Sequence, residues 1–191
     1  ARFTGAKDPP HPWLIVLNPD EAGLEFPEWA RELPDHQPAV VLRPRGVGPT
    51  KWTTKNPPNY VERSLALIGR TVDSGRVWDV SVAAHALKNR LWSTPGEEPT
   101  VTVVGKGQAG ILGAYAALFE PAISEVVLVE PPETHMKGPH FLNVLRVLDI
   151  PDALGLLAPR KLTIKGAPAE AFKKTAAFYE IAGAKNKFLL R

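Results

Sequence analysis

The segment Gly105-Lys106-Gly107-Gln108-Ala109-Gly110 has the glycine spacing of a turn that carries chemistry. It follows the β-branched run Val101–Val104 and precedes the apolar run Ile111–Phe119. Glycine adopts positive φ and lets one backbone approach another closely, as a short turn between a strand and a helix requires. We therefore expect a strand, a tight turn and a helix in this part of the chain.

Three interpretations of this turn remain open. As G-x-G-x-x-G it matches a dinucleotide-binding fingerprint that uses Gly105, Gly107 and Gly110. In that case Glu130, twenty residues after Gly110, would hold a ribose hydroxyl. As a strand-to-helix elbow the turn matches G-x-S-x-G, with Gly107 at the position of the nucleophilic serine. In the third interpretation it is a tight turn without chemistry.

A polar loop, Glu130–His140, follows the next β-branched run, Val126–Val129. Open parallel sheets bind their ligands at the carboxyl ends of the strands, so Glu130, His135 and His140 are candidates for a general base or a metal site. The spacing of His135 and His140 differs from the i, i+4 pair of a helical zinc motif. We therefore expect a polar loop at the rim of a cleft, and no metal.

Basic and aromatic residues are also expected near this edge. Arg43, Arg45, Lys106 and Lys137 would form a basic rim that attracts an anionic ligand such as a uronate or a phosphate. The alternative is that they are solvated charges on loops. Trp52 lies in a loop rich in Pro, Thr and Asn, and it is a candidate for stacking on a sugar ring.

Composition restricts the classes of function. With 191 residues, 44% of them hydrophobic and 23% charged, the chain has the length and composition of one globular domain. The net charge is only +3 and no Lys/Arg run is dense, so we expect no nucleic-acid partner. No apolar stretch is long enough to predict a membrane span. The absence of cysteine excludes disulfides, thiolate nucleophiles and cysteine-based zinc sites, and we expect no cofactor.

The order of the elements predicts the fold. Residues 1–12 are expected to form an arm or linker, and residues 13–191 one domain. Strands are predicted over Trp13–Leu17, Ala39–Leu42, Val101–Val104, Val126–Val129, Lys161–Ile164 and Phe188–Leu190. Helices are predicted over Tyr60–Trp92 with a break at Asp73-Ser74-Gly75, and over Glu28–Leu33, Ile111–Phe119, Phe141–Leu148, Asp152–Leu157 and Ala169–Ala182. This alternation predicts an α/β three-layer sandwich around a mostly parallel sheet of about six strands.

With this order of elements, the chain resembles the α/β-hydrolase superfamily, and within it the acetylxylan esterases and dienelactone hydrolases. The resemblance extends from about Trp13 to Arg191. It is carried by the segments WLIVLNPDEAG (13–23), AVVLRPRGVG (39–48), VTVVGKGQAGILGAYAAL (101–118), VVLVEPP (126–132) and APRKLTIKGAP (158–168). It implies a Ser-Asp-His triad, with half of the oxyanion hole in the loop after the first strand.

The chain departs from that triad at each position. Gly107 has no side chain where the serine is expected. The loop Gly166–Glu170, where the resemblance implies the catalytic acid, offers only Glu170, which is better interpreted as a residue of the first turn of a helix. The sequence ends at Arg191, soon after the last predicted strand, so no histidine follows it. The resemblance therefore implies a degenerate nucleophile elbow.

We accordingly expect a non-catalytic, α/β-hydrolase-like domain of a larger, acetylxylan esterase-like protein. It would be the companion of an active esterase domain, a homodimerisation partner or a module with a carbohydrate ligand. One alternative is a nucleotide-binding domain that uses Gly105, Gly107 and Gly110. Another is a carboxylic-ester hydrolase completed by residues outside this chain. The sequence does not assign a compartment; secretion or a periplasmic location would follow if the parent protein acts on polysaccharide.

Overall fold

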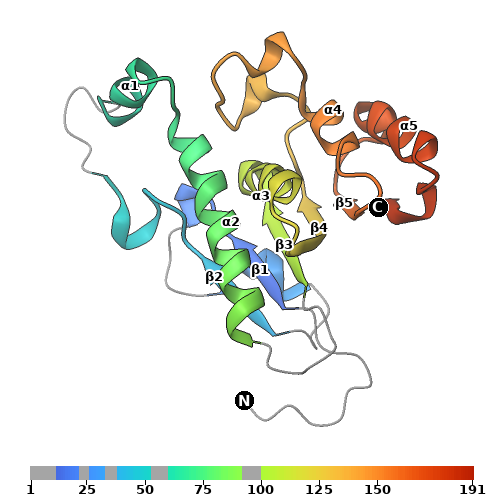
Figure 1. Ribbon diagram of the computed structural model, residues 1–191, viewed down its shortest axis with the longest axis horizontal. Coiled ribbons are helices and arrows are strands. Elements are labelled where there is room, and N and C mark those ends of the chain that lie inside the picture. The colour runs from blue at the N-terminus through green and yellow to red at the C-terminus, as the bar shows by residue number, and fades with distance from the viewer. Residues whose placement is uncertain (1–11, 22–25, 33–37, 53–59, 92–99) are drawn as a thin grey trace.

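The computed structural model describes residues 12–21, 26–32, 38–52, 60–91 and 100–191. Six strands form a single sheet in the order β2-β1-β3-β4-β5-β6, and every neighbouring pair is parallel (Figure 1). The strands are β1 Trp13–Val16, β2 Ala39–Leu42, β3 Val101–Lys106, β4 Ile123–Val129, β5 Lys161–Lys165 and β6 Phe188–Leu190. This confirms the predicted α/β three-layer architecture with a parallel sheet of about six strands.

The central strands are apolar on both of their sides. Val103 and Val104 are adjacent in β3, point to opposite faces of the sheet and are both fully buried. Parallel strands that are covered on both faces read as continuous hydrophobic runs, because neither side contacts water. Burial on both faces therefore explains the β-branched runs from which the sequence predicts β3 and β4.

One face of the sheet carries the α-helices. They are α2 Val72–Leu91, α3 Gly107–Phe119, α4 Ile150–Gly155 and α5 Lys173–Ile181. Buried residues of all four helices, including Val80, Ile111, Leu154 and Tyr179, belong to one hydrophobic cluster. Helix α1, Tyr60–Leu67, has no buried residue and lies beyond this layer, near the start of α2 (Figure 1).

The opposite face is covered by shorter segments in the described part of the chain. The 3₁₀ helix η2, Glu28–Glu32, places Trp29 and Ala30 against the sheet, and Val47 packs beside them from the loop after β2. Ile15 and Val104 are among the strand residues beneath. The third layer therefore consists of 3₁₀ and loop segments where the structure describes it.

The break in the long helical pattern lies earlier than predicted. Helix α1 ends at Leu67 and α2 begins at Val72, so Asp73, Ser74 and Gly75 belong to the first turn of α2. The Thr71 hydroxyl accepts from the Ser74 N–H at 3.0 Å, and the Ser74 hydroxyl accepts from the Thr71 N–H at 3.1 Å. The predicted break at 73–75 is wrong because these polar residues begin a helix instead of interrupting one.

The predicted helix over Phe141–Leu148 is also wrong. Only the 3₁₀ turn Val144–Arg146 is present, and Asn143 before it has a φ of 58° in the left-handed region. Leu145 and Val147 are exposed, so this apolar run has no buried face that would stabilise a helix. The segment forms a loop that projects beyond the sheet (Figure 1).

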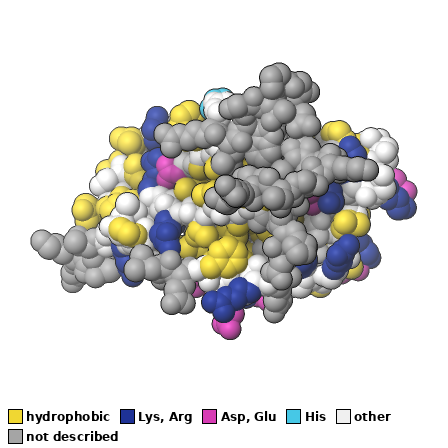
Figure 2. Space-filling view, turned by 90° about the horizontal axis from the view of Figure 1, so that it is seen from below, with side chains coloured by type: hydrophobic (Ala, Val, Ile, Leu, Met, Phe, Trp, Pro, Cys, Tyr) yellow, Lys and Arg dark blue, Asp and Glu magenta, His cyan; other side chains and the backbone are white. Residues whose placement is uncertain are grey.

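Among the described residues, no helix combines the length and the apolar character needed to cross a lipid bilayer. In the view from below, Lys and Arg side chains are spread between hydrophobic ones over the surface (Figure 2).

Candidate functional site

The glycine turn lies at the point where the sheet changes direction. Strand β2 lies on one side of β1 and β3 on the other, so the connection after β1 runs toward one edge of the sheet and the connection after β3 runs toward the other. Open α/β sheets bind ligands in the crevice at such a switch point, outside the carboxyl ends of the strands. The loop after β1 and the turn from β3 into α3 meet here, which makes this position the candidate functional site.

Gly107 has the backbone conformation of a sharp elbow. Strand β3 ends at Lys106 and α3 begins at Gly107, with no residue between them. Gly107 has a φ of 56°, and a Cβ built on it would have its nearest neighbour, Asn18 Nδ2, at 3.9 Å. A side chain would therefore have room here, but glycine supplies no nucleophilic atom.

Gly105 and Gly110 serve the packing of the helix on the strand. A Cβ on Gly105 would lie 2.5 Å from the Gly110 nitrogen, and a Cβ on Gly110 would lie 2.6 Å from the Gly105 oxygen. The two backbones are in direct contact, so any side chain at either position would separate α3 from β3. Strand–helix packing thus accounts for the glycine pattern that suggested a dinucleotide site.

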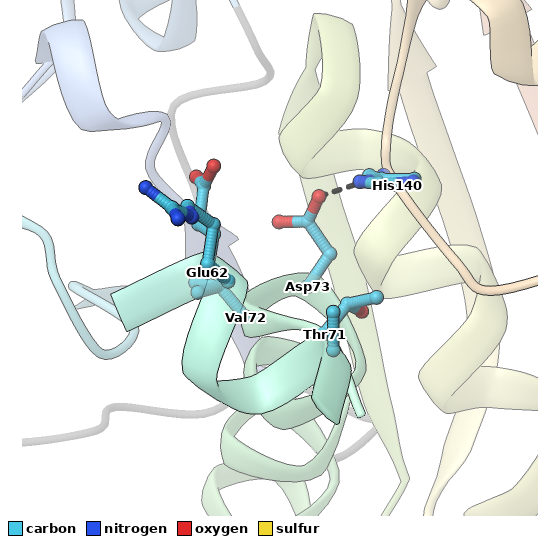
Figure 3. A pocket seen from close by; sticks show the side chains of 7 residues that line it. Glu62, Thr71, Val72, Asp73 and His140 are labelled. Atoms are coloured by element: carbon cyan, nitrogen blue, oxygen red, sulfur yellow. Dashed lines mark hydrogen bonds between the residues drawn. The ribbon is translucent and has the colours of Figure 1, made fainter. Parts of the chain in front are cut away.

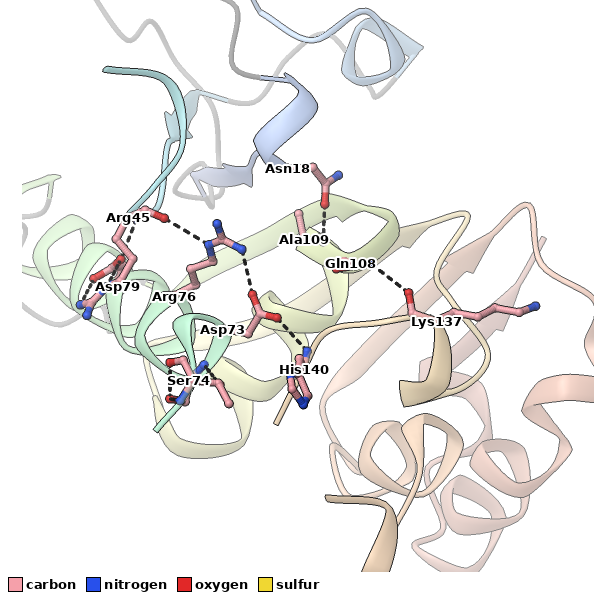
Figure 4. Close-up of polar contacts among 11 residues, drawn as sticks. Asn18, Arg45, Asp73, Ser74, Arg76, Asp79, Gln108, Ala109, Lys137 and His140 are labelled. Carbon is pink, nitrogen blue, oxygen red and sulfur yellow. Dashed lines mark hydrogen bonds and ion pairs between the residues drawn. The ribbon is translucent and has the colours of Figure 1, made fainter. Parts of the chain in front are cut away.

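Asn18 closes the crevice from the side of β1. Its Oδ1 accepts from the Ala109 N–H at 2.9 Å (Figure 4). Its Nδ2 donates to the Lys106 carbonyl at 2.9 Å. The Asn18 N–H, in the loop where the resemblance implies half of an oxyanion hole, donates to Glu21 Oε2 at 2.9 Å. Glu21 also accepts from the Trp29 indole. The Asn18 N–H and the side chains of Asn18 and Glu21 are thus bonded within the chain.

Lys106 and Glu130 form an ion pair across the ends of β3 and β4. The distance between Lys106 Nζ and Glu130 Oε2 is 2.9 Å. Glu130 has a φ of 46°, a left-handed conformation that is uncommon for a residue other than glycine. The carboxylate that is a candidate for binding ribose, or for acting as a base, is thus paired with Lys106 at the surface.

His135 is a buried structural residue. Its Nδ1 lies 2.9 Å from the Pro139 carbonyl, which only accepts, so we place the proton on Nδ1. The Nε2 then accepts from the Tyr115 hydroxyl at 2.8 Å. Burial, together with the Asp149 and Asp152 carboxylates, raises the pKa of Tyr115 to about 12, so this hydroxyl stays a donor at neutral pH. Both ring nitrogens of His135 are therefore engaged.

His140 lies at a different place, beside the first turn of α2. Its backbone N–H donates to Asp73 Oδ2 at 2.7 Å, and Arg76 Nη1 donates to Asp73 Oδ1 at 2.9 Å. Asp73 and His140 line a cavity of about 190 Å³ between α1 and this loop (Figure 3). Among the described residues, no three His, Asp or Glu side chains are arranged to hold a metal ion.

The two basic residues proposed to bind a ligand are each paired with a carboxylate. Arg45 donates to Asp79 from Nε at 2.9 Å and from Nη2 at 2.6 Å, and Lys106 pairs with Glu130. Burial alone would raise the pKa of Asp79, but the hydrogen bonds from Arg45 outweigh it and lower that pKa. The side chain of Gln108 donates to the Lys137 carbonyl at 2.9 Å (Figure 4). The expected basic rim is therefore largely compensated at Arg45 and Lys106.

Trp52 and Glu170 occupy other surroundings. The ring of Trp52 lies over Gly46, where a Cβ would come within 2.5 Å of it, and the side chain is half-buried. Glu170 pairs with Lys173 at 2.6 Å, and both side chains are mostly exposed. The structure thus places Trp52 as an anchor of the loop after β2, and Glu170 in a surface ion pair.

Comparisons with solved structures identify the fold. A protein classed as an acetyl xylan esterase, from Bacteroides fragilis, aligns with a TM-score of 0.63 and 14% identity over 96% of this chain and 59% of its own. A carbohydrate esterase family 15 glucuronoyl esterase from Caldicellulosiruptor kristjansonii gives 0.60 and 16% over 96% and 63%. An acylaminoacyl peptidase from Pyrococcus horikoshii gives 0.55 and 11% over 95% and 32%.

These similarities confirm the predicted α/β-hydrolase-type fold. No family model matches the sequence, and the search of curated proteins found no significant match. The chain spans 59% and 63% of the length of the two esterases, so it corresponds to a part of each protein and not to the whole. At 11–16% identity the likeness extends to the fold alone.

Proposed function

We propose that this chain is a non-catalytic domain of the α/β-hydrolase fold, and that it acts as a companion part of a larger esterase-like protein. The observation that carries the proposal is Gly107. The elbow keeps its sharp turn, its positive φ and the space for a side chain, while the residue that occupies it has no atom that could attack an acyl carbon.

The other residues of a triad support the same conclusion. A serine-type mechanism needs a histidine bonded to the nucleophile and an acid that orients the histidine. His135 is bonded through both ring nitrogens to Tyr115 and Pro139. Glu130 and Glu170 are paired with lysines. A new nucleophile at position 107 would therefore lack a free base among these candidates.

A binding role remains for a domain without chemistry. Two of the structural neighbours are, by their names, an acetyl xylan esterase and a glucuronoyl esterase. We extend this class of partner to the present chain: a carbohydrate ligand, or a companion esterase domain that acts on carbohydrate esters.

The test is hydrolysis of p-nitrophenyl acetate by the isolated chain, with the heat-denatured chain as the background. We expect no rate above that background, and no change for Gly107→Ser, because the variant gains a hydroxyl while both ring nitrogens of His135 stay bonded to Tyr115 and Pro139. Circular dichroism verifies that both proteins are folded. Saturable turnover that disappears in Glu130→Gln or His140→Ala would overturn the proposal.

A further inference from the structure

A second cleft lies on the outer side of α2, away from the elbow. It has a volume of about 560 Å³ and is lined by Leu65 of α1, Arg70 of the α1–α2 connection, Gly75 and Trp78 of α2, and Arg45 of the loop after β2. This volume falls in the range of about 300–1,000 Å³ that is usual for small-molecule sites. None of these residues takes part in the contacts at Gly107.

Trp78 is the aromatic wall of this cleft. Its side chain is 66% exposed, although it sits in the middle of a 20-residue helix. An indole presents a large apolar face with a negative quadrupole, to which the C–H face of a saturated ring or the edge of another aromatic ring is attracted. Leu65 adds a further apolar surface. The cleft therefore suits a ligand with a ring.

The charge of the cleft selects a monoanion. Arg45 is neutralised by its two-point contact with Asp79. Arg70 has no acidic partner within the described part of the chain, so the lining carries about one net positive charge. A carboxylate carries one negative charge and accepts two parallel hydrogen bonds from a guanidinium. A phosphate monoester carries about −1.5 to −2 at neutral pH and would be undercompensated here.

The floor of the cleft is fixed. A Cβ on Gly75 would lie 2.7 Å from Arg45 Nη1, so the absence of a side chain at this position lets Arg45 lie flat across α2. The hydroxyls of Thr71 and Ser74 are bonded to the backbone of the first turn of α2. Arg45 is held by Asp79, so the side chains that remain available to a ligand are Arg70, Trp78 and the apolar Leu65.

We propose that this cleft binds a ring that bears a single carboxylate, with the ring on Trp78 and the carboxylate on Arg70. Two kinds of molecule share this chemistry, a hexuronic acid and a phenolic acid. The inference rests on the proposed function, because it supplies the ligand class of a domain that binds without catalysing.

Isothermal titration of the isolated chain with four probes tests the ligand class. Glucuronate and 4-hydroxybenzoate carry both the ring and the carboxylate, glucose carries a ring alone, and acetate carries a carboxylate alone. We expect saturable binding of one of the two acids, with glucose and acetate at least about tenfold weaker. The acid that binds identifies the source. Failure of both acids to saturate, or acetate binding as tightly as either, would overturn the proposal.

Matched variants test the site. Trp78→Ala and Arg70→Gln are each expected to weaken binding by about tenfold or more, because each removes one of the two contacts. Phe119→Ala removes another exposed aromatic side chain, and Arg63→Gln another exposed arginine, on α1 itself; both should bind like the parent chain. Binding that survives either Trp78→Ala or Arg70→Gln in the folded variant contradicts the assignment.

The two proposals fail in different ways. Ester hydrolysis by the isolated chain would remove the non-catalytic assignment and leave a measured affinity at Trp78 intact. If the chain neither hydrolyses the ester nor binds either acid, only the proposed ligand site is contradicted, and the non-catalytic assignment stands.

Discussion

A side chain would lower the stability of the fold at Gly107 and at Gly105 for two different reasons. Gly107 has a φ of 56°, which disfavours any residue with a Cβ, but the space around it is open to 3.9 Å. Gly105 lies within β3, and a Cβ there would collide with the backbone of Gly110 at 2.5 Å. The first cost is conformational, and the second is steric and shared with the packing of α3.

Gly107→Ala is therefore expected to lower the free energy of unfolding by about 1–2 kcal/mol, the cost of the left-handed conformation. Gly69→Ala is the matched control, since Gly69 has a φ of 74° and no atom within 4 Å of its Cβ position. Gly105→Ala should cost more, about 3 kcal/mol or above, because backbone must move. Urea unfolding measures all three. A cost at Gly107 equal to that at Gly105 would show that the space at the elbow is not open.

Two residues of the candidate site differ in how far the sequence alone predicts their positions. The position of Gly107 in the elbow follows from local spacing, since a strand, a turn and a helix are neighbours in the chain. The role of Asn18 does not, because its partners Lys106 and Ala109 lie 88 and 91 residues away. The Asn-Pro pair predicts only a turn after β1.

Among the elements, α4 is joined most closely to the loop before it. Asp149 accepts from the N–H groups of Ile150 and His135, and its own N–H donates to Asp152, so a capping box begins the helix. Burial alone would raise the pKa of Asp149, but hydrogen bonds from Thr134 and from these N–H groups outweigh it and lower that pKa. A hydrogen bond from Lys174 likewise lowers the pKa of Asp152.

Stability should consequently fall in acid. The folded pKa values of Asp149 and Asp152 lie below the unfolded value of about 3.9, so their contribution is complete above that pH and is lost as the pH falls through the folded values. We expect the free energy of unfolding in urea to decrease from about pH 5 to pH 3, and to decrease less in Asp149→Asn. Glu170→Gln, in an exposed pair, is the control. An unchanged slope in Asp149→Asn would contradict the role of this cap.

The sequence predicts an element correctly where an apolar run is buried in the structure. Strands β3 and β4 and helix α3 are apolar because they are buried. The run Phe141–Leu148 is also apolar but has no fully buried residue, and composition does not distinguish the two cases. The break predicted at Asp73-Ser74-Gly75 is instead the start of α2, because polar residues at a helix start and at a helix break have the same composition.

In the whole molecule, the position of a strand in the sheet is expected to decide how stable that region is. Strands β3 and β4 have a strand on each side, whereas β2 and β6 are the outermost strands of the sheet. Helix α1 has no buried residue. We therefore expect the centre of the sheet around the elbow to be more stable than α1 and the outermost strands.

Hydrogen exchange followed by mass spectrometry tests this division. Amides of β3, α3 and β4 should exchange slowest, since opening them requires unfolding of the central sheet, and amides of α1 and β6 should exchange early. The comparison is internal, so each peptide serves as a reference for the others. Early exchange in β3 or late exchange in α1 would contradict the arrangement.

The fold class was predictable from the alternation of elements, because parallel strands need crossover connections. The 3₁₀ and loop cover of the second face, in the part of the chain that the structure describes, was not, since periodicity does not reveal that η2 is a 3₁₀ helix instead of an α-helix. The burial of His135 was equally hidden, because a histidine in a polar loop reads as a rim residue until its contacts with Tyr115 and Pro139 are known.

The amide of Asn18 has one more consequence. In an open parallel sheet, the crevice between connections that run in opposite directions is normally the place where a ligand binds. In this protein the Asn18 side chain lies in part of that crevice. Its carboxamide makes hydrogen bonds to one donor and one acceptor of the elbow. A hydroxyl at position 107 would thus fit beside Asn18, but a ligand in the crevice would need the Asn18 side chain to move.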